Sequence, residues 1–273
     1  MMQNLILSYM RNFPMDYGKG YLRKFIKLPA DKESLVRLTN SYGITYKLSL
    51  KDHVMREVYI NGVYEKNTIR QLRKLISPSM TFFDIGANIG TYSLTMAKFL
   101  PQGKVYSFEP NPRTRKFFQQ NITLNGFKNI EVIPVGLSDK EEVATLYTPS
   151  LTQASLNKHQ SSAEQETIQL TTLDRFCDER KIEQIDILKI DVEGHEVKCL
   201  MGALNVIKRS KKLIMILEID DNCLAAGHTK QSLFDMVINM GFRAYLPKGY
   251  PFPLKGITAI NEKYSDNIIF IKS

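Results

Sequence analysis

Short apolar runs alternate with segments of helical periodicity from residue 80 to the end of the chain, and this alternation constrains the fold more than any other feature. The apolar runs predict strands at MTFFDIG, GKVYSFEP, IEVIPVGLS, ILKIDVEG, KLIMILEID, FRAYLP and NIIFIK. Helices are expected between them over residues 90–100 and 112–125, from about 194, and over 230–240. Strands that alternate with helices form a mostly parallel sheet covered by helices. The sequence therefore predicts an α/β fold for this part of the chain.

The first 77 residues follow a different pattern. A helix is expected over residues 2–12. The stretch from 34 to 62 alternates around the turn dipeptides Tyr42-Gly43 and Asn61-Gly62, which predicts two or three antiparallel strands. A second helix is expected over EKNTIRQLRKLI, ending at Pro78. We therefore expect a small helix and β-hairpin appendage over 1–77, followed by the α/β domain over 78–273.

Charge is concentrated in that appendage. Residues 1–77 carry about 14 Lys and Arg against about 6 Asp and Glu, which is nearly all of the chain's net charge of +9. A basic surface of this kind can meet an anionic acceptor or an anionic surface, and the alternative is a merely solvated face. The chain contains no paired zinc ligands and no RNP-type aromatic motif, so no specific nucleic-acid partner is expected.

Composition limits the compartment. No apolar run approaches the roughly 18 residues that a membrane span requires, so no transmembrane segment is expected. The N-terminus lacks a long apolar core followed by a small-residue cleavage site, and it is expected to be an amphipathic helix. The three cysteines lie far apart in the sequence, which favours reduced thiols in a cytoplasmic protein.

Four of the predicted strands end in an acidic residue: Asp84, Glu109, Asp191 and Glu218. The carboxyl ends of parallel strands meet at one edge of the sheet, where ligands bind. Because a buried carboxylate requires a partner, four of them at one edge indicate a binding site more than a structural role.

The stretch DIGANIG points to the ligand. Gly86 permits a tight turn and close approach of the backbone to a ligand, and Gly90 permits the next helix to pack near the strand. Glu109, 19 residues after Gly90, stands where a carboxylate accepts both ribose hydroxyls of an adenosine ligand. The G-x-G-x-x-G spacing that admits a pyrophosphate is missing, and Asp84 ahead of the first glycine suits an ammonium or sulfonium. These features favour S-adenosylmethionine; a nucleotide cofactor or a structural loop is the alternative.

Several segments together resemble the FkbM-type methyltransferase family. They are FFDIGANIGTYS, SFEPNP, NGFKNIEVIPVGLSD, TLDRF, DILKIDVEGHEVKCLMGA and IMILEI, and the resemblance covers about 55 to 273. It implies a Rossmann-like class I methyltransferase fold with a mostly parallel seven-stranded sheet and a late antiparallel strand. It also implies the following cofactor residues, the last two at the adenine: Asp84, Gly86, Asn88, Gly90, Glu109, Ser138 and Asp139.

The segment KIDVEGHE supplies the catalytic candidates, because the end of the fourth strand faces the transferable methyl group in this class of fold. Asp191, Glu193 and His195 leave the strand in turn, and a histidine that titrates near neutral pH can accept a hydroxyl proton. The alternative is that the acids favour the helix N-terminus and that His195 packs. A divalent ion held by Asp191 and the EIDDN segment is a further possibility, but no metal ligand is assigned.

The resemblance and the strand-end acids together predict an enzyme, an S-adenosylmethionine-dependent O-methyltransferase that acts on a saccharide or polysaccharide hydroxyl. The alternatives are O-methylation of a small-molecule natural product or lipid, methylation of a nucleic acid, and a module that binds the cofactor without turnover. The fourth strand ends in acids and not in an NPPY-like element, which weakens the nucleic-acid alternative. Residues 148–167 are polar and are expected to form a long mobile loop.

Overall fold

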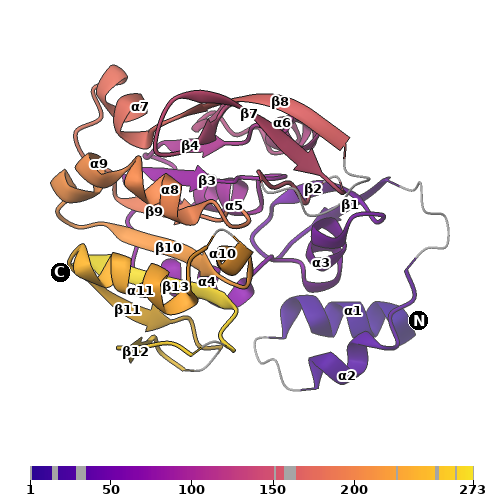
Figure 1. Ribbon diagram of the computed structural model, residues 1–273. Helices are drawn as coiled ribbons and strands as arrows, with labels where there is room; N and C mark the ends of the chain where they lie inside the picture. Colours follow the sequence, from indigo (N-terminus) through magenta and orange to yellow (C-terminus); the bar gives the residue numbers. More distant parts are fainter. Residues whose placement is uncertain are drawn as a thin grey trace.

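The computed structural model describes residues 2–13, 18–28, 35–150, 152–156, 164–225, 227–249, 252–261 and 263–272. Helices and strands alternate along most of this length (Figure 1). The helices are α1 Met2–Asn12, α2 Lys19–Arg23, α3 His53–Asn61, α4 Lys66–Leu72, α5 Thr91–Phe99, α6 Pro112–Asn125, α7 Leu173–Glu179, α8 Glu196–Met201, α9 Leu204–Arg209, α10 Asn222–Ala225 and α11 Lys230–Asn239. The strands are β1 Leu35–Thr39, β2 Thr45–Ser49, β3 Phe82–Ile85, β4 Val105–Phe108, β5 Ile130–Ile133, β6 Gly136–Leu137, β7 Glu142–Thr148, β8 Glu164–Thr171, β9 Ile187–Ile190, β10 Ile214–Ile219, β11 Phe242–Leu246, β12 Lys255–Ile257 and β13 Asp266–Lys272.

The central sheet has eight strands in the order β12-β11-β13-β10-β9-β3-β4-β5. The five strands from β10 to β5 are parallel, and β13 enters antiparallel between β10 and β11. This order confirms the predicted Rossmann-like fold with a late antiparallel strand. The short edge strand β12 makes the sheet one strand wider than the predicted seven.

Both faces of the sheet are buried, because alternate strand residues point to opposite sides. Phe83 and Leu188 pack with helices α7, α8, α9 and α11 in one core cluster. Their neighbours Phe82 and Ile187 pack with α4 and α5 in a second cluster on the other face. The strands are apolar on both sides for this reason, which explains why they appear in the sequence as continuous apolar runs.

The predicted third strand of the N-terminal appendage is wrong, because residues 53–61 form helix α3. Asp52 caps this helix by accepting from the Met55 backbone N–H at 3.0 Å. Gly62, at φ 75°, ends it, so Asn61-Gly62 is a helix C-terminus and not a hairpin turn. The β1–β2 hairpin around Tyr42-Gly43 is confirmed. Helix α4 ends at Leu72, several residues before the expected stop at Pro78.

The appendage packs against the α/β domain. The β1–β2 hairpin and α3 share a core cluster with α5 and α6, in which Leu48 and Met55 meet Leu94 and Phe118. Helices α1 and α2 lie together beside α3 (Figure 1). Because the two parts share buried surface, their packing does not define a boundary at residue 77. The division of the chain at this residue stays a prediction.

The expected long loop over 148–167 is partly wrong. Its two ends belong to strands β7 and β8, which pair antiparallel and form a three-stranded sheet with β6. The two strands were missed although Ile168 and Leu170 alternate with polar residues and are buried with Leu146. Residues 151 and 157–163 of the expected loop lie outside the described part of the chain.

Candidate active site

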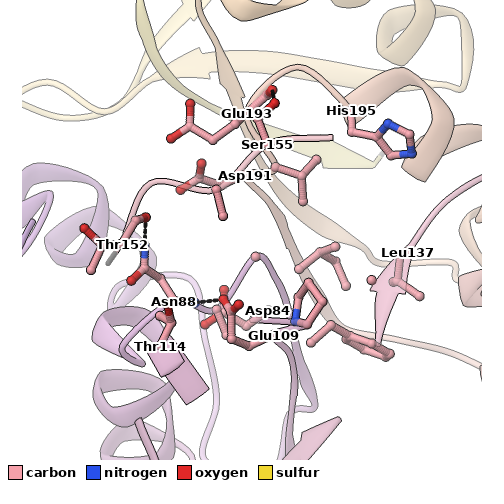
Figure 2. Close-up of a pocket in the computed structure, with 18 of the residues that line it drawn as sticks. Asp84, Asn88, Glu109, Thr114, Leu137, Thr152, Ser155, Asp191, Glu193 and His195 are labelled. Atoms are coloured by element: carbon pink, nitrogen blue, oxygen red, sulfur yellow. Dashed lines mark hydrogen bonds between the residues drawn. The ribbon is translucent and has the colours of Figure 1, made fainter. Parts of the chain in front are cut away.

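A cavity opens at the carboxyl ends of β3, β4 and β9, with β6 and the β7–β8 hairpin on one side (Figure 2). Asp84, Glu109, Asp191 and Glu218 all line this cavity, so the four strand-end acids do meet at one edge of the sheet. Gly86 also lines the cavity, and a Cβ at this position would come within 1.9 Å of the Asp191 carbonyl oxygen. The first turn of the motif therefore requires glycine because two strand ends approach each other closely.

Asp84 is the most informative of these acids. Its side chain is buried, and its Oδ2 accepts from Ser93 Oγ at 2.5 Å. Among the described residues, its Oδ1 has no hydrogen-bond partner. A buried carboxylate oxygen without a partner is costly. The cavity therefore fits a ligand with a cationic donor at this end, such as the ammonium group of S-adenosylmethionine.

Glu109 is held in place by the backbone. Its Oε2 accepts from the Asn88 N–H at 2.8 Å, and its Oε1 accepts from the Asn111 N–H at 2.8 Å. Each carboxylate oxygen has a second lone-pair site, so Glu109 could still accept two hydroxyl donors from a ligand. Burial raises the pKa of Glu109 to about 7, and the two backbone hydrogen bonds oppose this shift.

The other end of the cavity is apolar. Residues from the ends of β4 and β6 face residues from the β7–β8 hairpin and the segment after β7: Phe108, Pro110, Leu137, Leu146, Ala154, Leu156, Ile168 and Leu170. A flat, largely apolar ring such as adenine could occupy this region, beyond Glu109. Leu146, Ile168 and Leu170 of this set belong to the hairpin that the sequence prediction missed.

Residues 152–156, which we call the covering segment, contribute Thr152, Ala154, Ser155 and Leu156 to the cavity wall and are hydrogen-bonded to three parts of the protein. Thr152 donates to Asp52 Oδ2 from its Oγ1 at 2.5 Å and from its N–H at 3.1 Å. The Thr152 carbonyl accepts from Asn88 Nδ2 at 2.8 Å, and Ser155 Oγ donates to the Glu193 carbonyl at 3.1 Å (Figure 2). The covering segment thus links the N-terminal appendage to the ends of β3 and β9.

A buried charge network lies at the β9 end of the cavity. Lys189 Nζ donates to Asp191 Oδ2 at 2.6 Å, and it lies 4.8 Å from the centroid of the Tyr92 ring. Although burial opposes ionisation, the Lys189 charge lowers the pKa of Asp191. The charge of Asp191, together with burial, raises the pKa of Glu218 well above its ordinary range. Of the two neighbouring carboxyl groups, Asp191 is therefore the ionised one, and Glu218 is protonated at neutral pH.

Glu193 follows in a left-handed backbone conformation with φ 51°. Its Oε2 accepts from Asn222 Nδ2 at 2.7 Å, and its side chain lines the cavity. Burial, followed by the charge of Asp191, raises the pKa of Glu193 to about 7. The backbone turn itself is held by Glu196, whose Oε1 accepts from the Val192 and Gly194 N–H groups. Glu196 therefore stabilises the turn, and the Glu193 side chain faces the cavity.

His195 borders the cavity, but its ring is directed away from the carboxylates of Asp191 and Glu193 (Figure 2). Its Nε2 lies 3.0 Å from Ser138 Oγ, and burial lowers its pKa to about 4. Ser138 Oγ also donates to Asp139 Oδ1 at 3.0 Å. The structure thus brings His195, Ser138 and Asp139 together outside the carboxylate cluster, and Ser138 and Asp139 are not among the cavity-lining residues.

Gly90 does not line the cavity either. A Cβ at this position would come within 2.1 Å of the Phe118 ring of α6. The expectation that Gly90 permits the next helix to pack near the strand is wrong, because Gly90 permits close packing against helix α6 instead. No group of acids, histidines and cysteines among the described residues is arranged to hold a metal ion.

The model of the methyltransferase FkbM domain matches residues 84–244, from the first strand-end acid to β11. The chain belongs to the FkbM methyltransferase family. It is an S-adenosylmethionine-dependent methyltransferase with a class I fold. Most of the residues that line the cavity described above fall within the matched range.

Relatives in the family carry different names. The chain is 25% identical over 185 residues to the hexuronic acid methyltransferase AglP of Haloferax volcanii, covering 67% of this chain and 74% of that protein. It is 23% identical over 199 residues to the 2-O-methyltransferase NoeI of Sinorhizobium fredii, covering 66% and 80%. It is 27% identical over 235 residues to the AMB antimetabolite synthetase AmbE of Pseudomonas aeruginosa, covering 71% of this chain but 11% of that protein.

The fold contains no helix, within the described residues, with the length and apolar character of a membrane span. The three cysteines, Cys177, Cys199 and Cys223, are buried and free.

Proposed function

We propose that this methyltransferase acts on a hydroxyl group of a saccharide, and that the cavity at the carboxyl ends of β3, β4 and β9 holds its cofactor. S-adenosylmethionine, when bound, supplies an electrophilic methyl group. Asp84 would accept from its ammonium group, and Glu109 would accept from its ribose hydroxyls. The apolar region between Phe108 and the β7–β8 hairpin would contain the adenine, next to Leu137.

The observation that carries the hydroxyl assignment is Glu193. A carboxylate with a pKa of about 7 is suited to act as a general base at neutral pH. We assign it the removal of the acceptor proton, while Asp191 is held ionised by its pair with Lys189. His195 is a weaker candidate for this role than the sequence suggested, because it faces Ser138 and its pKa is lowered to about 4.

The saccharide assignment rests on the relative named for a hexuronic acid, and the relative named as a 2-O-methyltransferase supports transfer to oxygen. The alternative is a natural-product acceptor, which the similarity to the antimetabolite synthetase supports. We also propose a cytoplasmic location, which the free cysteines favour. An anionic acceptor or surface facing the basic residues 1–77 remains part of the proposal.

A turnover assay tests this function. The purified chain is incubated with S-adenosylmethionine and a panel of neutral and uronic-acid glycans, beside a panel of lipids and small natural products, and S-adenosylhomocysteine is measured. Product formation with a glycan supports the proposal. Turnover only with the lipids or natural products would transfer the assignment to the alternative, and cofactor binding without any turnover would support a binding module.

A further inference from the structure

A second cavity lies beside the cofactor cavity, between the N-terminal helices and the start of β13. Consecutive residues of one short stretch of chain line the two cavities. Tyr64 lines the cofactor cavity, and the next residue, Glu65, lines the second cavity. The charges of Lys189 and Asp191 act on the Glu65 carboxylate, and those of Glu65, Asp191 and Glu193 act on Tyr64, so the wall between the two cavities lies within reach of this charge network.

Glu65 has an unusual conformation for its position. Its backbone is left-handed, with φ 47° and ψ 50°, which a residue with a side chain adopts only at a cost. Its Oε2 accepts from Tyr92 Oη and, at 2.6 Å, from Asn267 Nδ2. Three elements thus converge on this carboxylate: the turn before α4, helix α5 and strand β13. The strained conformation is held by its surroundings, as is common at binding sites.

The chemistry of the second cavity differs from that of the adenine end. Asn61, Glu65, Asn67, Thr68 and Asp266 supply polar or charged side chains to its wall. Hydroxyl-rich rings are matched by carboxylate and amide groups of this kind, whereas apolar ring systems or acyl chains would cover these groups without adding a hydrogen bond. The N-terminal helices contribute Met10 and Lys19, which come from outside the family match at 84–244.

We infer that the second cavity is the acceptor subsite, that it holds one sugar ring whose reacting hydroxyl extends past Tyr64 toward Glu193, and that Glu65 accepts a hydrogen bond from another ring hydroxyl. The inference rests on the proposed saccharide function and specifies where the acceptor binds. Under this inference, the N-terminal appendage and the turn before α4 determine which acceptor binds, while the ends of β3 and β4 hold the cofactor.

The test uses two variants of the subsite and one matched control. Asn67→Phe places an aromatic ring in the second cavity, and Glu65→Gln removes the charge while keeping one oxygen acceptor. Gln119→Phe is the control, since Gln119 lines a separate surface groove beside α6. Binding of methyl β-D-glucopyranoside and methyl β-D-glucuronoside to the S-adenosylhomocysteine-loaded full chain is followed by saturation-transfer NMR, and S-adenosylhomocysteine affinity by calorimetry.

We expect Asn67→Phe and Glu65→Gln to weaken sugar binding by roughly tenfold, and to raise the acceptor KM on any glycan that is methylated, because a buried hydrogen bond is lost or blocked. S-adenosylhomocysteine affinity should stay near that of the wild type in both, and Gln119→Phe should change nothing. Unchanged sugar binding and KM in both subsite variants would overturn the inference, as would an equal loss in Gln119→Phe.

The outcomes also separate this inference from the proposed function. Glycan turnover that is insensitive to Asn67→Phe and Glu65→Gln leaves the function standing and removes the subsite. Sugar binding that depends on both residues, without any turnover on glycans, leaves the subsite standing and removes the function. If neither sugar binds and no glycan is methylated, both proposals are overturned.

Discussion

Replacing Glu193 by glutamine tests the assignment of the general base. Glutamine keeps the size of the side chain and an oxygen that can accept from Asn222 Nδ2, so the turn after β9 should keep its geometry. The turn is also held independently by Glu196. The change therefore removes a titrating group from the cavity while leaving the surrounding backbone in place.

General-base catalysis contributes about 10²–10⁴ to a rate, so kcat of Glu193→Gln should fall by that factor. Cofactor affinity should change little, because Asp84 and Glu109 lie at other strand ends. The raised pKa of Glu193 adds a second signature. Below its value of about 7 the wild-type base is protonated, so kcat should fall about tenfold per pH unit as the solution is acidified.

The assay is a pH profile of kcat for the wild type, for Glu193→Gln and for His195→Gln as the control. We expect the inflection near 7 in the wild type and in His195→Gln, and its loss in Glu193→Gln. If Glu193→Gln keeps near-wild-type kcat, or keeps the inflection, the base is a different group. A loss of rate confined to His195→Gln would return the assignment to His195.

Four further outcomes are expected. Glu109→Ala should weaken S-adenosylmethionine binding by about 1.5–3 kcal/mol, the range for a hydrogen bond to a charged group, and unchanged calorimetric affinity would remove Glu109 from the site. Thr152→Val should speed S-adenosylhomocysteine release in stopped-flow measurements, because the Oγ1 bond from Thr152 to Asp52 is lost, and an unchanged release rate would show that the covering segment does not retain the product. Chelation by EDTA should leave turnover unchanged, and rescue by magnesium of a chelated, inactive enzyme would show that a divalent ion takes part. The ligand-free protein should unfold at a lower temperature at pH 8 than at pH 6. Burial raises the folded-state pKa of Glu65, Glu109 and Glu193 to about 7, above an unfolded value of about 4.3. Their contribution to stability is therefore complete below the unfolded pKa and is lost as the pH rises through about 7. A melting temperature that rises from pH 6 to pH 8 would contradict this.

The strands and helices of the α/β domain could be predicted because their signals are local. Helix α6 begins and ends where the sequence indicates, since Asn111 caps it, Pro112 occupies its first turn and Gly126 ends it in a left-handed conformation. The strand-end acids could be predicted for a similar reason. Once a parallel sheet is expected, its carboxyl ends must meet at one edge, and Asp84, Glu109 and Asp191 follow.

The missed features depend on contacts between distant residues. The β7–β8 hairpin buries few apolar residues, and its polar composition resembles that of a loop. Helix α3 alternates enough to resemble a strand, and only its cap by Asp52 and the burial of Met55 and Val58 identify it. The direction of the His195 ring could not be predicted, because it is set by a partner 57 residues earlier in the chain, Ser138.

Transfer of an isotope-labelled methyl group tests the central claim most directly. The chain is incubated with S-adenosylmethionine carrying a ¹³C-labelled methyl group and a glycan panel, and the labelled product is identified by NMR. We predict that the label appears as a methyl ether on a sugar oxygen, with one S-adenosylhomocysteine formed for each methyl group transferred. A label on nitrogen, carbon or a carboxyl ester, or no transfer to any glycan while another acceptor is methylated, would contradict the account.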